Sequence, residues 1–205
     1  MHLDWQQALV NVILLWVLTA PHEFAHAWVA TRLGDNLPRA QGRLTLNPLA
    51  HVDWLGTAIL PFVTSLLGGG FLGWGKPVMT QTARLRGGLN GLALVSLAGP
   101  AMNVALAVIL AVLAVATAHV LPAFSAFAEH GVLLSLYLAL FNMIPVPPLD
   151  GSKLLLAARI PMAIYQELAR AGFLVLVVLL SATRVGLYLN EWAYLGARAI
   201  FAGLR

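Results

Sequence analysis

The clearest chemical signal in the sequence is the run His22-Glu23-Phe24-Ala25-His26. Residues four apart share one face of a helix, so two imidazoles at this spacing can bind a single zinc ion. A carboxylate that is not itself a ligand can then take a proton from water whose pKa the metal has lowered. The run therefore predicts a hydrolytic zinc site, with His22 and His26 as ligands and Glu23 as general base.

Two simpler interpretations compete with this one, a chance occurrence of the pattern and a polar helix face that lines a water-filled cavity without metal. The run lies in a long apolar stretch, where an ionisable side chain costs about 2.5–3.5 kcal/mol on insertion scales. Three such side chains within one short run favour a functional site.

A catalytic zinc ion needs a third protein ligand and an open coordination position. Asp150 is the candidate, because it follows the proline-rich stretch 142–149, which can break a helix and turn a carboxylate inward. Gly151 eases the tight turn that this requires. Asp150 also suits the N-cap of a helix beginning at Ser152, and the residues alone leave both interpretations open.

The two motifs together resemble the signature motifs of the site-2 protease family of intramembrane metalloproteases, in its compact prokaryotic branch. His-Glu-x-x-His lies in an early apolar helix, and Asn142-x-x-Pro-x-x-Pro-Leu-Asp150-Gly follows another helix over a hundred residues later. Three connecting segments, 42–53, 73–78 and 98–103, add to the resemblance, which covers about residues 8–160.

The resemblance implies that His22, His26 and Asp150 bind one zinc ion and that Glu23 is the general base. It also implies that Asn142 helps to hold the substrate or the tetrahedral intermediate. A neutral donor near the metal can stabilise a developing oxyanion, although an interhelical hydrogen bond is an equally good explanation for Asn142.

Composition places these residues in a membrane. Of the 205 residues, 60% are hydrophobic and 10% are charged, and the mean hydropathy is +0.84, which leaves too little polar surface for a water-soluble globule. The net charge of +4 is scattered between apolar runs and forms no basic stripe, so we expect the bilayer and no nucleic acid as partner. The absence of cysteine excludes disulfides and thiolate metal ligands.

Apolar runs predict an all-α membrane protein, a polytopic bundle of about 4–6 transmembrane helices. Segment 55–72 either crosses the membrane or re-enters it, and short interfacial strands are expected around Arg43–Leu46. Segment 185–204 either crosses or lies in the interface. The basic residues favour one side of the membrane, which should hold Arg32, Arg39, Arg43, Lys76, Arg84, Arg86, Lys153 and Arg159.

We expect residues 1–205 to form one integral membrane protease domain, with a catalytic core at 8–160 and additional C-terminal helices at 161–205. The expected activity is that of a zinc metalloendopeptidase acting on transmembrane proteins, in the inner membrane of a prokaryotic cell, with substrate selection by a separate regulatory or adaptor protein. A catalytically silent scaffold and a metal or proton transporter are the rival functions. His51, near Asp53, either belongs to a second polar site or stabilises its loop.

Overall fold

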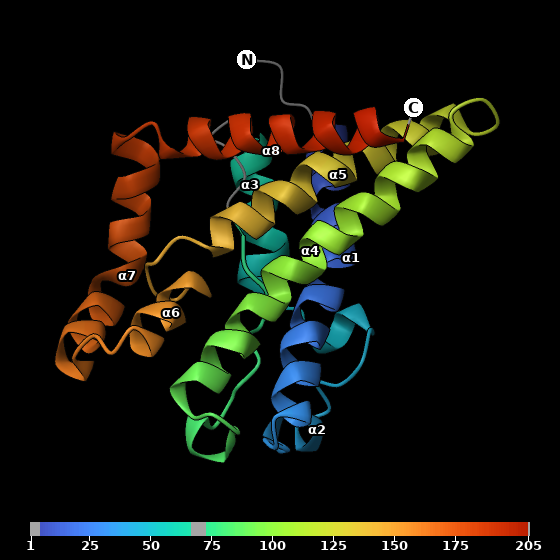
Figure 1. Cartoon of the computed structure of the whole chain (residues 1–205). Coiled ribbons are helices and arrows are strands. Elements are labelled where there is room, and N and C mark those ends of the chain that lie inside the picture. The colour runs from blue at the N-terminus through green and yellow to red at the C-terminus, as the bar shows by residue number, and fades with distance from the viewer. Residues whose placement is uncertain (1–4, 67–72, 205) are drawn as a thin grey trace.

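The computed structural model describes residues 5–66 and 73–204, and its elements are helical (Figure 1). Four helices are long and apolar enough to cross a membrane. They are α1 (Trp5–Arg32), α4 (Leu89–Thr117), α5 (Pro122–Asn142) and α7 (Met162–Ala182). The predicted all-α polytopic bundle is confirmed, and the chain is an integral membrane protein.

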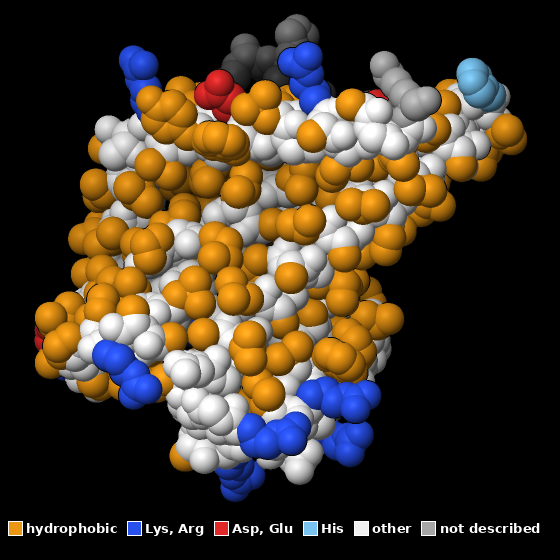
Figure 2. Space-filling view, in the orientation of Figure 1, with side chains coloured by type: hydrophobic (Ala, Val, Ile, Leu, Met, Phe, Trp, Pro, Cys, Tyr) orange, Lys and Arg blue, Asp and Glu red, His pale blue; other side chains and the backbone are white. Residues whose placement is uncertain are grey.

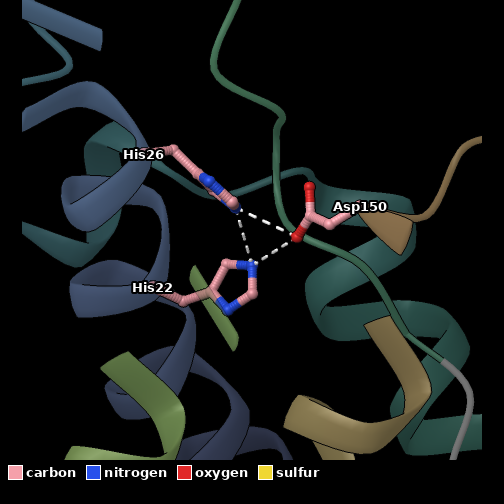
Figure 3. A group of neighbouring side chains, drawn as sticks. All are labelled: His22, His26 and Asp150. Carbon is pink, nitrogen blue, oxygen red and sulfur yellow. Dashed lines mark hydrogen bonds and ion pairs between the residues drawn. The ribbon is translucent and has the colours of Figure 1, made fainter. Parts of the chain in front are cut away.

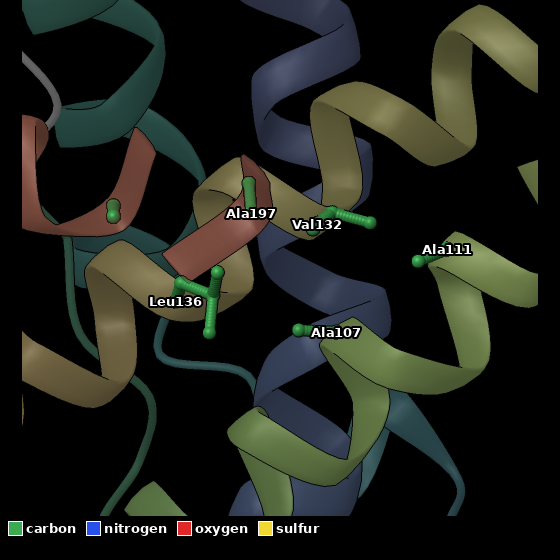
Figure 4. Packing of buried hydrophobic residues seen from close by; sticks show 6 residues of the cluster. Ala107, Ala111, Val132, Leu136 and Ala197 are labelled. Carbon is green, nitrogen blue, oxygen red and sulfur yellow. The ribbon is translucent and has the colours of Figure 1, made fainter. Parts of the chain in front are cut away.

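Helices α1, α4 and α5 form the centre of the bundle. Small residues on α4, Ala107 and Ala111, are fully buried and allow Val132 and Leu136 of α5 to pack closely against them (Figure 4). Ala197, from a C-terminal helix, covers the same cluster. Close approach through small residues is the usual way in which membrane helices associate. In lipid the hydrophobic effect does not drive helices together, so association depends on close van der Waals packing.

The described part of segment 55–72 favours the re-entrant interpretation; residues 67–72 lie outside the described residues. A π-helical stretch, η2 (Trp54–Ile59), runs into α3 (Leu60–Leu66), and together they reach roughly 20 Å, which is short of a bilayer core of about 30 Å. The backbone N–H of Trp74 then donates to the Gly56 carbonyl, and the backbone N–H of Arg86 donates to the Leu33 carbonyl. The chain therefore returns to the end of α1 from which it left.

The predicted interfacial strands are wrong. Arg43–Leu46 is irregular backbone between two short helices, α2 (Leu37–Ala40) and η1 (Pro48–Ala50), and no strand forms among residues 5–66 and 73–204. The Arg43 N–H donates to the Pro38 carbonyl, and its guanidinium donates to the Ala50 carbonyl. Turns and side chains thus satisfy backbone groups that a partner strand would otherwise have to pair.

The proline-rich stretch ends helix α5 and separates it from the next helix. Helix α5 ends at Asn142, and the short helix α6 (Gly151–Ala157) begins after an irregular segment that includes a cis bond between Pro147 and Pro148. Three prolines in this segment cannot donate a helical hydrogen bond, so the helix cannot continue through them. The break leaves Asp150 at the start of α6, directed toward α1.

The two C-terminal helices lie at the periphery of this centre and pack against it through a few residues, such as Ala197 and Leu176. In Figure 1, α8 (Val185–Gly203) lies across one end of the molecule, transverse to α7. It is absent from the candidate spans among the described residues, which favours the interfacial alternative for segment 185–204. Figure 2 shows Lys and Arg side chains at both ends of the molecule, with the larger group at the end opposite α8. This larger group agrees with the predicted charge bias.

Candidate metal centre

Three side chains from two distant parts of the chain meet at one point. His22 Nε2 lies 3.1 Å from Asp150 Oδ2, His26 Nε2 lies 3.0 Å from the same oxygen, and the two nitrogens are 3.1 Å apart (Figure 3). All three side chains are buried. The spacing of the His-Glu-x-x-His run and the break before Gly151 thus bring together the three ligands that the sequence predicted.

The orientation of His26 is compatible with a bound cation. His26 Nδ1 lies 2.6 Å from the Val95 carbonyl, which can only accept, so in the neutral ring Nδ1 carries the proton and Nε2 presents a lone pair. That lone pair faces a carboxylate oxygen and a second imidazole nitrogen. Zinc bound at about 2.0–2.2 Å would hold tetrahedral ligand atoms roughly 3.3–3.5 Å apart, close to the separations observed.

Helix α4 positions all three candidate ligands, although it supplies none of them. The Val95 carbonyl orients His26, and the Ser96 hydroxyl donates to the Asp150 carbonyl. A Cβ built at Gly99 would lie 2.3 Å from His26 Nε2 and 2.5 Å from His22 Nε2. Only glycine lets α4 pass this close to the two imidazole rings.

Sequence reasoning missed Val95 and Ser96. The Val95 contact uses a backbone carbonyl, which any residue type provides, so no signal in the sequence could have revealed it.

Asp150 occupies the N-cap position of α6, but its side chain makes no capping hydrogen bond. One carboxylate oxygen faces the two histidines, and the other accepts from Lys153 Nζ at 2.9 Å. The geometry therefore favours the ligand interpretation over the capping one. Lys153, which sequence reasoning did not connect with the site, fixes which oxygen points at the metal position.

Glu23 is buried beside the triangle but does not belong to it. Its Oε2 accepts the Val78 N–H at 3.1 Å. The carboxylate is thus held in place by the extended segment around Val78, next to the candidate ligands, as a general base must be.

The candidate ligands line a cavity of about 140 Å³, which is also bordered by Glu23, Trp74 and Asn142. At about 30 Å³ per molecule this is room for a few waters. Asn142 is half-buried at the end of α5, and its amide donates to the Leu138 carbonyl one turn earlier. The structure places Asn142 at the cavity wall and outside the ligand triangle.

His51 and Asp53 do not share a second polar site. His51 Nε2 lies 2.9 Å from the Thr45 carbonyl, and Asp53 Oδ1 accepts from the Gly56 N–H at the start of η2. Both residues bind their own loop, which agrees with the loop-stabilising interpretation of His51.

A buried His-His-Asp triangle with an adjacent carboxylate, in a bundle of membrane-spanning helices, defines the class of membrane metallohydrolases. Comparison with known proteins agrees with this class. Residues 10–130 match the family model described as Peptidase family M50.

The chain is 36% identical over 197 residues to the "Putative zinc metalloprotease YwhC" of Bacillus subtilis, covering 91% of this chain and 85% of that protein. It is 37% identical over 203 residues to the "Putative zinc metalloprotease Rip2" of Mycolicibacterium smegmatis, covering 94% and 73%. No solved structure matches it.

The chain belongs to peptidase family M50, the site-2 protease family. The family and the names of these relatives support a metalloprotease, and the His22–His26–Asp150 group can hold a metal ion.

Proposed function

We propose that this protein is an intramembrane zinc metalloendopeptidase that hydrolyses peptide bonds within or near transmembrane segments of other membrane proteins. The observation that carries the proposal is the buried triangle of His22, His26 and Asp150 inside the apolar span of α1. At 1.5 Å per residue, the two histidines lie roughly 9–15 Å from the Arg32 end of this helix. That depth supports a reaction below the membrane surface.

His22, His26 and Asp150 would hold the zinc ion, and the remaining residues prepare the reaction around it. When bound, the ion lowers the pKa of a water molecule and polarises the peptide carbonyl. Glu23, oriented by the Val78 N–H, takes a proton from the attacking water. As the carbon–oxygen bond forms and the carbon–nitrogen bond breaks, Glu23 delivers that proton to the leaving nitrogen.

The size of the cavity limits the form in which a substrate can be bound. The candidate ligands are buried beside a cavity of about 140 Å³, so we infer that a substrate segment unwinds locally before its carbonyl reaches the site. Unwinding is costly in lipid, where freed backbone groups have no water to pair with. We therefore propose that substrates are transmembrane segments with an intrinsically weak helix at the cleaved position.

We further propose that the protein works in the inner membrane of a prokaryotic cell and that a separate regulatory or adaptor protein selects its substrates. The two relatives named above come from bacteria, which supports the first part.

Cleavage of a labelled transmembrane peptide by the purified protein in detergent tests the proposal. We expect Glu23→Gln to lower turnover by at least about 10²-fold, at the low end of the contribution of general acid–base catalysis, and to retain zinc. A wild-type protein that binds zinc but cleaves no transmembrane peptide would instead be the catalytically silent scaffold. Undiminished turnover in Glu23→Gln would remove the assigned base.

A further inference from the structure

Asn103 is a second polar side chain in the site cavity, and its role is not explained by the metal centre. It lies on α4, one helical turn after Gly99, where α4 passes the two histidines. Its side chain is 1% exposed and borders the same cavity as Glu23 and Asp150. Among the described residues, nothing donates a hydrogen bond to its Oδ1.

The backbone of Asn103 is firmly held while its amide is not. The Ser135 hydroxyl of α5 donates to the Asn103 carbonyl at 2.7 Å, which anchors this turn of α4 to the neighbouring helix. Rotation about the Cβ–Cγ bond exchanges the oxygen and the NH₂ group, so either can be turned toward the cavity. The protein thus presents a neutral hydrogen-bonding group, on a fixed turn of backbone, beside the predicted reaction centre.

A buried amide without a partner is unfavourable, and a leucine would fill its place without that cost. The chemistry of the carboxamide indicates what would pair with it. One donor and one acceptor on a planar group match a peptide bond, whereas a neutral amide compensates poorly for a charged ligand. Asn142 borders the same cavity but is only half-buried, and one of its N–H groups donates to the Leu138 carbonyl.

We propose that Asn103 binds the backbone of the unwound substrate next to the cleaved bond, by pairing its amide with a substrate peptide group. This inference rests on the proposed function and names a binding contact within it. An unwound segment in the membrane carries backbone groups that must be satisfied. Asn103 satisfies one of them, and the substrate in turn satisfies Asn103.

Substrate binding can be measured without turnover in the Glu23→Gln background. The probe is a fluorescein-labelled peptide with about 20 Leu and Ala residues and a central Gly-Pro break, added to the zinc-loaded protein in detergent micelles. Loss of one hydrogen bond in Asn103→Leu should raise the Kd about 5–10-fold while zinc content and Tm stay at the parent value.

Ser125→Ala is the matched control. Ser125 is also a buried polar residue between α4 and α5, and its hydroxyl donates to the Ala114 carbonyl far along α4 from the histidines. We expect its Kd to equal that of the parent. If Asn103→Leu does not fold, Asn103→Ala, which removes the amide without adding bulk, decides the question by the same criterion.

A Kd unchanged in Asn103→Leu overturns the proposal, because water alone then satisfies the amide. A Kd that rises only together with loss of zinc also overturns it, because Asn103 then supports the metal centre and not the substrate. Failure of the wild-type protein to cleave the peptide that it binds would count against the proposed function and not against this contact.

Discussion

The membrane-spanning helices differ in how much of their apolar surface the protein itself covers. In the most apolar stretch of α1 and of α5, 50% and 56% of the residues are buried inside the protein, whereas in α7 the share is 11%. The first group surrounds the candidate ligands, and α7 faces mostly outward with residues such as Leu174, which is 66% exposed. Hydropathy alone cannot separate these helices, because lipid and protein interior are equally apolar.

The difference shows that buried polar groups and small residues, and not apolarity, mark the working part of this membrane protein. The buried ionisable residues His22, His26, Glu23 and Asp150 all belong to the part formed by α1, α4–α6 and the segment between α1 and α4. The charged pair on α7, Arg170 with Glu167, is largely exposed. If this comparison is correct, matched substitutions in the two regions should have very different effects.

Adding one methyl group should have its largest effect at Gly99. In Gly99→Ala the new Cβ would lie within 2.6 Å of the atoms expected to bind zinc, and a displacement of about 1 Å at a reacting centre can cost about 10²-fold. We expect zinc content and cleavage to fall by at least about that factor. Gly186→Ala, at the start of α8, meets nothing closer than 3.9 Å and should leave both unchanged; equal behaviour of the two variants would undo the comparison.

Removing a positive charge should matter at Lys153 and not at Arg170. Lys153 fixes the orientation of the Asp150 carboxylate, and loss of such a supporting contact typically weakens metal affinity about 10–100-fold. Zinc titration with a competing chelator should show this for Lys153→Met. Arg170→Met breaks an exposed ion pair, which contributes little. A zinc affinity unaltered in Lys153→Met would contradict the assigned support of Asp150.

Truncating a leucine should distinguish packing against protein from packing against lipid. Leu18 is fully buried against α5, so Leu18→Ala should destabilise the fold by about 1–3 kcal/mol, less than in a water-soluble core because only packing is lost. Leu174→Ala on α7 should change stability by less than about 0.5 kcal/mol. Unfolding in mixed micelles measures both, and a cost at Leu174 equal to that at Leu18 would place α7 inside the bundle.

Much of the site was predictable because it is encoded locally. The four-residue spacing of His22 and His26 is meaningful on any helix, and the apolar run around it predicted that helix. The role of Asp150 was harder to predict, because an aspartate just before a helix suits both an N-cap and a metal ligand. Only the fold, which brings residues 124 apart in sequence to 3.0 Å, separates the two interpretations.

The parts that the sequence did not reveal depend on partners distant in the chain. The Val95 carbonyl acts through the backbone, and the free amide of Asn103 is visible only once its surroundings are known. The mistaken strand at Arg43–Leu46 has a related cause. Alternating polar and apolar residues suit a strand, but a strand needs a neighbour, and the turns at both sides of this stretch satisfy its backbone first.

The central claim is that His22, His26 and Asp150 bind one zinc ion together. Zinc content of the purified wild-type protein and of Asp150→Ala, measured with X-ray absorption at the zinc edge, tests it most directly. We predict about one zinc per wild-type chain, with two imidazole nitrogens and one carboxylate oxygen at about 2.0–2.2 Å, and strongly reduced zinc in the variant. An Asp150→Ala protein that keeps its zinc with an unaltered absorption spectrum would contradict the claim.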